Sequence, residues 1–178
     1  MKNITVSAAA LTATLLAILG GVALAQQDRS TLRIPDGLTF AEFKGYESWE
    51  AVTVTQNEGR LKIIAANPVM IRAFKRGLPA DGQSFPEGSR IVKLEYTRTV
   101  DTTSPAGPIA KPTALQAVEF IVKDTKRFPN TKGWAYAIFL NDQATQTLKP
   151  IGSGTICGFA CHGKVAGQDY IFNRYAPR

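Results

Sequence analysis

The sequence predicts a mainly β (α+β) fold, in which one antiparallel sheet carries a few short helices. Several stretches alternate apolar and polar residues with the period of two that is typical of half-buried strands. Turn-forming Gly, Pro, Asn and Asp residues separate these stretches, and the sequence shows no internal repeat. A chain of 178 residues that loses a leader segment is expected to form a single domain.

The N-terminus has the order of a secretory signal peptide. Lys2 gives a positive start, an uncharged run rich in Ala and Leu follows, and the triplet Ala-Leu-Ala ending at Ala25 is a cleavage site. An uncleaved membrane anchor is the alternative, but the apolar run is short and is interrupted by Gly20 and Gly21. We therefore expect residues 1–25 to be removed, which leaves a periplasmic chain with no membrane segment.

The segment after the cleavage site is expected to form an arm that leads into a hairpin. Residues 26–45 have few periodic apolar positions and predict a loosely packed N-terminal arm. Residues 49–56 and 60–67 alternate with period two, and the turn residues between them close the hairpin.

A short helix is expected directly after this hairpin. Asn67 and Pro68 are typical of an N-cap and a first helical position. Gly77 is a natural stop, so the helix is predicted over residues 68–76.

The rest of the chain predicts further strands separated by polar loops. The Pro- and Gly-rich stretch 101–112 is expected to be a loop. The expected strands, chosen by alternation, are 90–100, 115–124, 134–140 and 169–175.

The charge of the chain is strongly basic, with a formal net charge of +7 at pH 7. Its Lys and Arg residues are scattered, with only short pairs such as Lys75-Arg76. This pattern favours a solvated basic surface, so we expect no nucleic-acid partner. An acidic redox partner fits the same surface.

Both cysteines and the single histidine of the chain fall within ten residues of one another. Cys157, Cys161 and His162 form the pattern C-x-x-x-C-H, one residue longer than the C-x-x-C-H of c-type haem attachment. In that chemistry two thiols add to the haem vinyl groups and the histidine ligates the iron. We expect the extra residue to bulge, with Gly158 supplying backbone freedom.

Other chemistries compete for the same three side chains. Two thiolates and an imidazole suit Cu(I), although the adjacent Cys161 and His162 point awkwardly at one ion. Zinc would need a fourth ligand that the chain does not obviously provide. A Cys157–Cys161 disulfide is common in secreted proteins, although so short a loop gains little from closure. The pattern alone leaves haem and disulfide about level, with copper behind.

Four longer segments of the sequence, the last of which overlaps this motif, help to decide between these chemistries. They read YESWEAVTV, FPEGSRIVK, VKDTKRFPNTKGWAYAIF and CHGKVAGQDYIFNRYAP, and they run in order from residue 46 to residue 177. In this order they resemble the cytochrome P-460 family, which includes the gas-binding cytochromes c′-beta. The resemblance implies that residues 46–178 form a β-rich domain with one haem c per chain, commonly as a homodimer.

The resemblance also implies roles for individual residues. Cys157 and Cys161 would form the thioether bonds, and His162 would be the proximal iron ligand beside an open sixth position. Lys93 stands where hydroxylamine-oxidising members cross-link a lysine to the haem, whereas its strand position alone predicts a solvent-facing side chain. Glu119 aligns with a glutamate near the haem that would accept substrate protons, or it is a rim residue paired with a lysine.

Two further residues are candidates for this site. Met70 could supply a thioether ligand, but its helical spacing predicts a core position. Lys62 stands where some members carry arginine.

The resemblance implies one main activity and leaves two alternatives. The first is oxidation of hydroxylamine to nitric oxide or nitrous oxide, with a periplasmic electron acceptor as partner. The second is a non-catalytic protein that binds nitric oxide or similar gases, like the cytochromes c′-beta. The third is a haem-free β-domain with a Cys157–Cys161 disulfide.

Overall fold

The computed structural model describes residues 27–35, 37–57, 59–80, 82–152 and 154–175. The expected signal peptide, residues 1–25, lies outside these ranges. Within them, no helix combines the length and the apolar character needed to cross a membrane.

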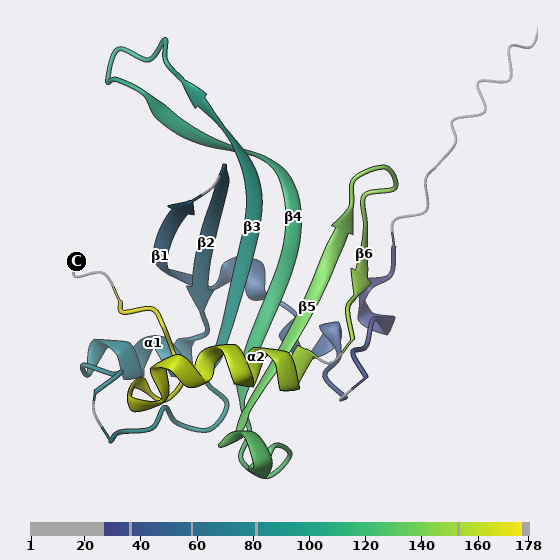
Figure 1. Ribbon diagram of the computed structural model, residues 1–178, viewed down its shortest axis with the longest axis vertical. Coiled ribbons are helices and arrows are strands. Elements are labelled where there is room, and N and C mark those ends of the chain that lie inside the picture. The colour runs from purple at the N-terminus through teal and green to yellow at the C-terminus, as the bar shows by residue number, and fades with distance from the viewer. Residues whose placement is uncertain (1–26, 36, 58, 81, 153, 176–178) are drawn as a thin grey trace, which may run out of the picture.

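A single antiparallel sheet organises the described residues, with its six strands neighbouring one another in sequence order (Figure 1). The strands are β1 (Glu50–Asn57), β2 (Arg60–Ala66), β3 (Arg90–Asp101), β4 (Ile109–Lys123), β5 (Trp134–Asp142) and β6 (Thr147–Pro150). Each strand pairs with the next one along the chain, including β2 and β3, although residues 67–89 separate these two strands. The mainly β fold expected from the sequence is confirmed.

The hairpin of β3 and β4 extends beyond the rest of the sheet (Figure 1). The pairing of β2 with β3 ends at Thr97, and β5 pairs with β4 only from Ala117 onward. The expected loop over 101–112 is therefore too long, because β4 already begins at Ile109 and Pro112 pairs with Arg98. Where β4 borders β3 alone, a proline without an N–H is tolerated.

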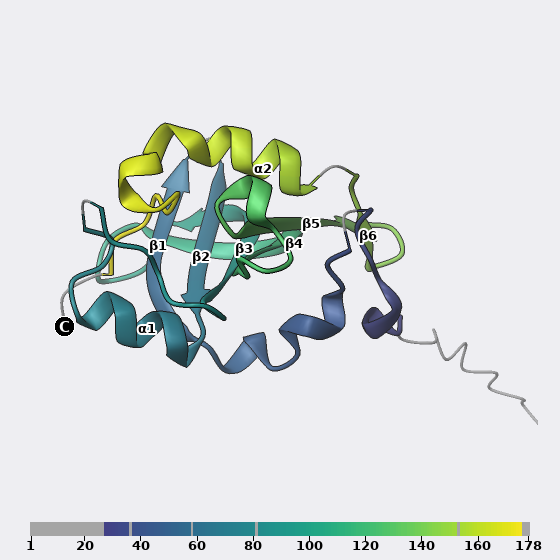
Figure 2. The ribbon, with the colours of Figure 1, turned by 90° about the horizontal axis from the view of Figure 1, so that it is seen from below.

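The N-terminal arm packs against one face of the sheet, on the side opposite α2 (Figure 2). It forms three 3-10 turns, η1 (Arg29–Thr31), η2 (Phe40–Phe43) and η3 (Tyr46–Ser48). The expectation of loose packing is wrong, because Leu38 and Phe43 are fully buried and the Phe43 ring stacks on Phe120 at 4.0 Å between centroids. Aromatic side chains that are spaced irregularly in the sequence anchor this segment, so periodicity did not reveal it.

Two α-helices pack against the sheet. The first, α1 (Pro68–Lys75), follows the predicted bounds closely, and the Met70 N–H donates to the Asn67 side chain that caps it. The second, α2 (Gly154–His162), crosses the sheet and continues into the 3-10 turn η5 (Gly163–Gln168) (Figure 1). A further 3-10 turn, η4 (Pro129–Thr131), connects β4 to β5.

The last described segment is not the strand expected over 169–175. Asp169 and Tyr170 have φ values of 47° and 63°, so the chain turns sharply there and then runs without a sheet partner. Its Ile171 side chain is buried in the cluster that contains Trp134 and α1. The apolar alternation of this segment therefore reflects packing against other elements, not pairing within the sheet.

Candidate functional site

Helix α2 places the two cysteines on one side. Cys157 and Cys161 are four residues apart, and residues at that spacing lie one above the other on a helix surface. The bulge expected at the extra residue is wrong, since α2 runs unbroken from Gly154 to His162. Cys161 carries a free thiol within the described part of the chain, so the structure gives no support to the disulfide alternative.

Two glycines allow α2 to lie directly against β5. A Cβ atom added to Gly158 would lie 2.3 Å from Cγ of Tyr136, and one added to Gly154 would lie 2.8 Å from the Tyr136 carbonyl oxygen. Both distances are shorter than real contacts allow. Gly158 therefore serves close approach within a regular helix, which corrects the backbone freedom expected for it from the sequence.

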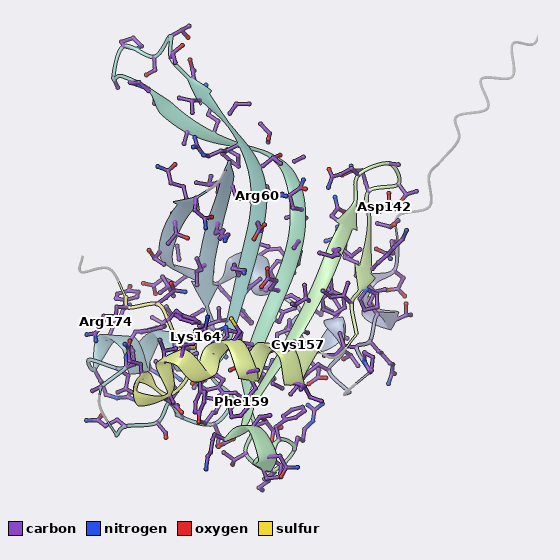
Figure 3. All side chains as sticks on the ribbon, in the orientation of Figure 1. Arg60, Asp142, Cys157, Phe159, Lys164 and Arg174 are labelled. Carbon is purple, nitrogen blue, oxygen red and sulfur yellow. The ribbon has the colours of Figure 1, made fainter. Side chains whose placement is uncertain are left out.

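A cavity of about 400 Å³ lies between α2, the sheet and the C-terminal segment. This volume falls within the range of small-molecule and cofactor sites. Figure 3 shows Cys157 on α2 where the helix passes in front of the strands. The cavity brings together the five residues to which the resemblance assigns a role, namely Lys93, Glu119, Cys157, Cys161 and His162. The other residues that line it are Thr55, Lys62, Ile64, Phe120, Ile121, Tyr136, Ala137, Ile138, Gly158, Phe172 and Asn173.

Lys93 and Glu119 form an ion pair on the sheet side of this cavity. They are directly opposite each other on β3 and β4, with 2.6 Å between Nζ and Oε2. Their side chains are 31% and 23% exposed, so Lys93 is not the fully solvent-facing lysine that its strand position alone predicts. A lysine and a carboxylate thus stand together in the wall that faces the cysteine helix.

The structure places Lys62 and Met70, the two other candidates from the sequence, in different parts of the protein. Lys62 lines the cavity from β2 and lies 3.8 Å from the Glu95 carboxylate. Met70 is fully buried in the core beneath α1, as its helical spacing predicts.

His162 ends α2 and is fixed by its backbone and ring contacts. Its Nδ1 lies 2.6 Å from the Tyr170 carbonyl oxygen, which can only accept a hydrogen bond, so Nδ1 carries the proton. Burial, opposed by this hydrogen bond and reinforced by the charge of Lys93, lowers the pKa of His162. A neutral ring with its proton on Nδ1 leaves Nε2 as the free lone pair, which is the form that ligates a metal.

Aromatic side chains enclose the imidazole of His162. The ring centroids of Tyr136 and Phe172 lie 4.8 Å and 4.9 Å from its own. The Tyr136 hydroxyl is buried and has no hydrogen-bond partner among the described residues. Burial raises the pKa of Tyr136, so this hydroxyl remains a donor. A buried donor without an acceptor, at the wall of a cavity, is expected where a bound group completes the site.

These features fit a haem better than an ion held by side chains alone. The site offers two thiols one helical turn apart, one imidazole with a free Nε2, and a cavity that all three groups line. Within the described ranges, His, Cys, Asp and Glu residues form no group of three suited to hold a metal ion. The copper and zinc alternatives therefore find no ligand set in these residues.

Several residues of the site were not identified from the sequence. Tyr136 shares a strand face with Trp134 and Ile138, and the alternation of that strand could have drawn attention to it. The Tyr170 carbonyl and the Phe172 ring carry no such signal, because their positions depend on the turn that follows η5.

Comparison with known proteins identifies one family. A search of curated proteins found no match. The family model for cytochrome P460 matches residues 43–173, which is more than half of the chain and includes β1 to β6, α2 and the cavity between them. The chain therefore belongs to the cytochrome P460 family, and it is a cytochrome whose cofactor is a haem.

Proposed function

We propose that this cytochrome carries a single haem c and oxidises hydroxylamine to nitric oxide or nitrous oxide in the periplasm. The observation that carries the proposal is the cavity where the cysteine–histidine helix faces the Lys93–Glu119 pair. The thiols and the imidazole are the groups of c-type attachment. Lys93 is the residue that the sequence resemblance relates to the cross-linked lysine of hydroxylamine-oxidising members.

The groups on α2 hold the cofactor in this proposal. When bound, the haem would supply an iron centre able to accept electrons from the substrate. Cys157 and Cys161 would attach it through thioether bonds. His162 presents Nε2 as the proximal ligand while its Nδ1–H donates to the Tyr170 carbonyl, which keeps the ring in one orientation.

The groups on the sheet handle the substrate. Oxidation of hydroxylamine releases protons together with electrons, so a carboxylate within the cavity is needed to accept them. Glu119 is such a carboxylate, and its Oε2 lies 2.6 Å from Nζ of Lys93 in the same cavity wall. Both side chains line the same cavity as the cysteines and His162.

One observation favours a second candidate function, the capture of nitric oxide without catalysis. The ammonium group of Lys93 already has a partner in Glu119, so the lysine is satisfied without a bond to the haem. A cytochrome with an uncrosslinked lysine would resemble the gas-binding cytochromes c′-beta.

Mass spectrometry of the denatured holoprotein separates the two functions. A tryptic haem fragment that includes Lys93 is expected for the enzyme, and a free Lys93 peptide would refute it. Lys62→Arg is the matched control because Lys62 lines the same cavity from β2, and it should leave the fragment unchanged. Lys93→Arg should abolish the linked fragment. A protein with no Soret band would favour the haem-free alternative over both.

The remaining parts of the proposal concern location and partners. We propose export through the segment 1–25, an electron acceptor with an acidic surface, and a homodimer; the acceptor's charge would complement the basic mature chain, whose formal charge is +6 because cleavage removes Lys2 from the +7 of the full chain. N-terminal sequencing of the mature protein should begin at Gln26, and light scattering should give twice the mass of the mature chain. An uncleaved N-terminus or a monomer would refute the corresponding part.

A further inference from the structure

A buried ion pair lies next to the segment that holds the histidine. Nζ of Lys123, on β4, is 3.0 Å and 3.2 Å from the two carboxylate oxygens of Asp169, which follows η5. The two side chains are only 4% and 7% exposed. Charged groups at this depth persist only when they are paired and hydrogen-bonded. The function proposed above uses neither residue.

The carboxylate of Asp169 makes four contacts with three donor groups. Besides the two contacts with Lys123, it accepts the Phe85 N–H at 2.7 Å and the Trp134 Nε1–H at 3.2 Å. These contacts fill the acceptor capacity of an ionised carboxylate. Lys123 also donates to the Lys132 carbonyl at 2.9 Å, and its Nζ lies 4.7 Å from the centroid of the Trp134 ring. The pair thus fixes the start of the C-terminal segment to β4, β5 and the loop before β3.

The backbone at this anchor adopts an unfavourable conformation. Asp169 and Tyr170 are consecutive non-glycine residues in the left-handed region, with φ of 47° and 63°. Such residues persist where the surrounding structure over-determines them, and they concentrate at functional sites. The turn that they form directs the Tyr170 carbonyl back to Nδ1 of His162 at 2.6 Å. The Tyr170 ring also stacks on Phe159 of α2, 4.9 Å between centroids.

We infer that Asp169, held by Lys123, is a positioning residue for the His162 ligand. The buried pair locks the left-handed turn, and the turn fixes the carbonyl that binds the imidazole Nδ1–H. This inference rests on the proposed role of His162 as the proximal ligand. A histidine held in this way is a more basic and better oriented ligand, and such outer partners change metal affinity or activity about 10- to 100-fold. Loss of the anchor should weaken the iron–histidine bond and favour the ferrous state.

Two readouts on the holoprotein test this inference, the ferrous iron–histidine stretching frequency and the midpoint potential. Asp169→Asn keeps a side chain that tolerates the left-handed turn but removes the charge, so a small downward shift in frequency is expected. The apolar double variant Lys123→Met/Asp169→Ala removes the whole anchor without leaving a buried charge unpaired. It should lower the frequency further and change the ferrous-to-ferric ratio about tenfold, or about 59 mV for one electron.

The control is Asp101→Asn, which breaks the 2.6 Å pair with the exposed Lys111 on the β3–β4 hairpin and should move neither readout. If both Asp169 variants match the wild type in both readouts, the inference is overturned. If the double variant does not fold, the Asp169→Asn result decides. A wild type with a Soret band but no iron–histidine band would overturn the assignment of His162 and this inference with it. An unshifted band in the variants would overturn this inference alone.

Discussion

The contact between Gly158 and Tyr136 gives the sharpest test of how the cysteine helix is placed. The substitution Gly158→Ala adds one methyl group that would lie 2.3 Å from Cγ and 2.5 Å from Cβ of Tyr136. These two atoms are at the base of the tyrosine side chain, so a rotation of the ring cannot relieve the overlap. Tyr136 is 3% exposed within the sheet, and the strand beneath it has little freedom to retreat. The helix itself must move.

The size of this effect follows from two opposing contributions. Carbon atoms pack at about 3.5–4.0 Å, so α2 and β5 must separate by more than about 1 Å near this residue. Overpacking of this kind costs about 1–3 kcal/mol. Alanine in a helix is more favourable than glycine by about 1 kcal/mol, which offsets part of the cost. We expect Gly158→Ala to lower the free energy of unfolding by up to about 2 kcal/mol.

Urea unfolding followed by circular dichroism measures this change, with Gly167→Ala as the matched control. An added Cβ at Gly167 in η5 meets no atom within 4 Å, so that variant should be as stable as the wild type or slightly more so. Because α2 carries His162 while Glu119 lies on the sheet, the displacement should also slow hydroxylamine oxidation, by up to about 100-fold. If Gly158→Ala and Gly167→Ala were equally stable, the close approach of α2 to β5 would be refuted.

Three other predictions concern the two faces of the sheet. Glu119→Gln should slow hydroxylamine oxidation about 100-fold or more, because it removes the proposed proton acceptor. It should change the free energy of unfolding by less than about 1 kcal/mol, because the Glu119–Lys93 pair is partly exposed. Unchanged turnover would contradict the role of Glu119 as proton acceptor. His162→Gly should shift the Soret band, and added imidazole should restore it; a spectrum unaffected by the substitution would exclude His162 as the ligand. Burial, which raises the pKa of Glu42, is outweighed by hydrogen bonds led by that from Arg127, so the net pKa is lowered. Because the folded value lies below the unfolded one, Arg127→Gln should destabilise the protein at pH 7 by up to about 1 kcal/mol. The part of this difference that depends on Glu42 should shrink as the pH falls below the ordinary glutamate pKa of about 4.3 and disappear below the lowered folded pKa.

The alternation of apolar residues predicted β1 to β5, whereas the four-residue β6 (Thr147–Pro150) was not predicted. β1 and β2 lie within one residue of their predicted bounds, and the Asn67 cap marks the start of α1. The pattern failed where residues are buried without strand pairing, or where a helix contacts the sheet through small residues. In α2 small residues such as Gly154 and Gly158 make the contact with the sheet, so no apolar stripe marks the helix. In the last segment Ile171 is buried without any strand pairing.

The candidate site was predictable as a set of residues but not as an arrangement. Lys93 and Glu119 were singled out through a family resemblance, while their direct pairing depends on the register of β3 and β4. Two irregularities near Tyr96 shift that register, and neither strand's own sequence fixes them. The Tyr170 carbonyl that holds His162 is a backbone group, so its role cannot be predicted from the type of residue at that position.

Because residues 154–162 form a helix, the effect of the extra residue in C-x-x-x-C-H on the positions of the cysteines can be worked out. Successive residues on a helix are about 100° apart, so moving the second cysteine from the third to the fourth position turns it by that angle but keeps it on the same side. Cys161 and His162 remain adjacent, as in the shorter motif, while Cys157 and His162 are separated by one residue more. The spacing therefore alters the position of Cys157 relative to the ligand and leaves the Cys161–His162 unit intact. In an extended segment residues four apart would also share a face, whereas the three-residue step of the shorter motif would place the thiols on opposite faces. The helix and the glycines that hold it against β5 bring both thiols of the longer motif to one cavity.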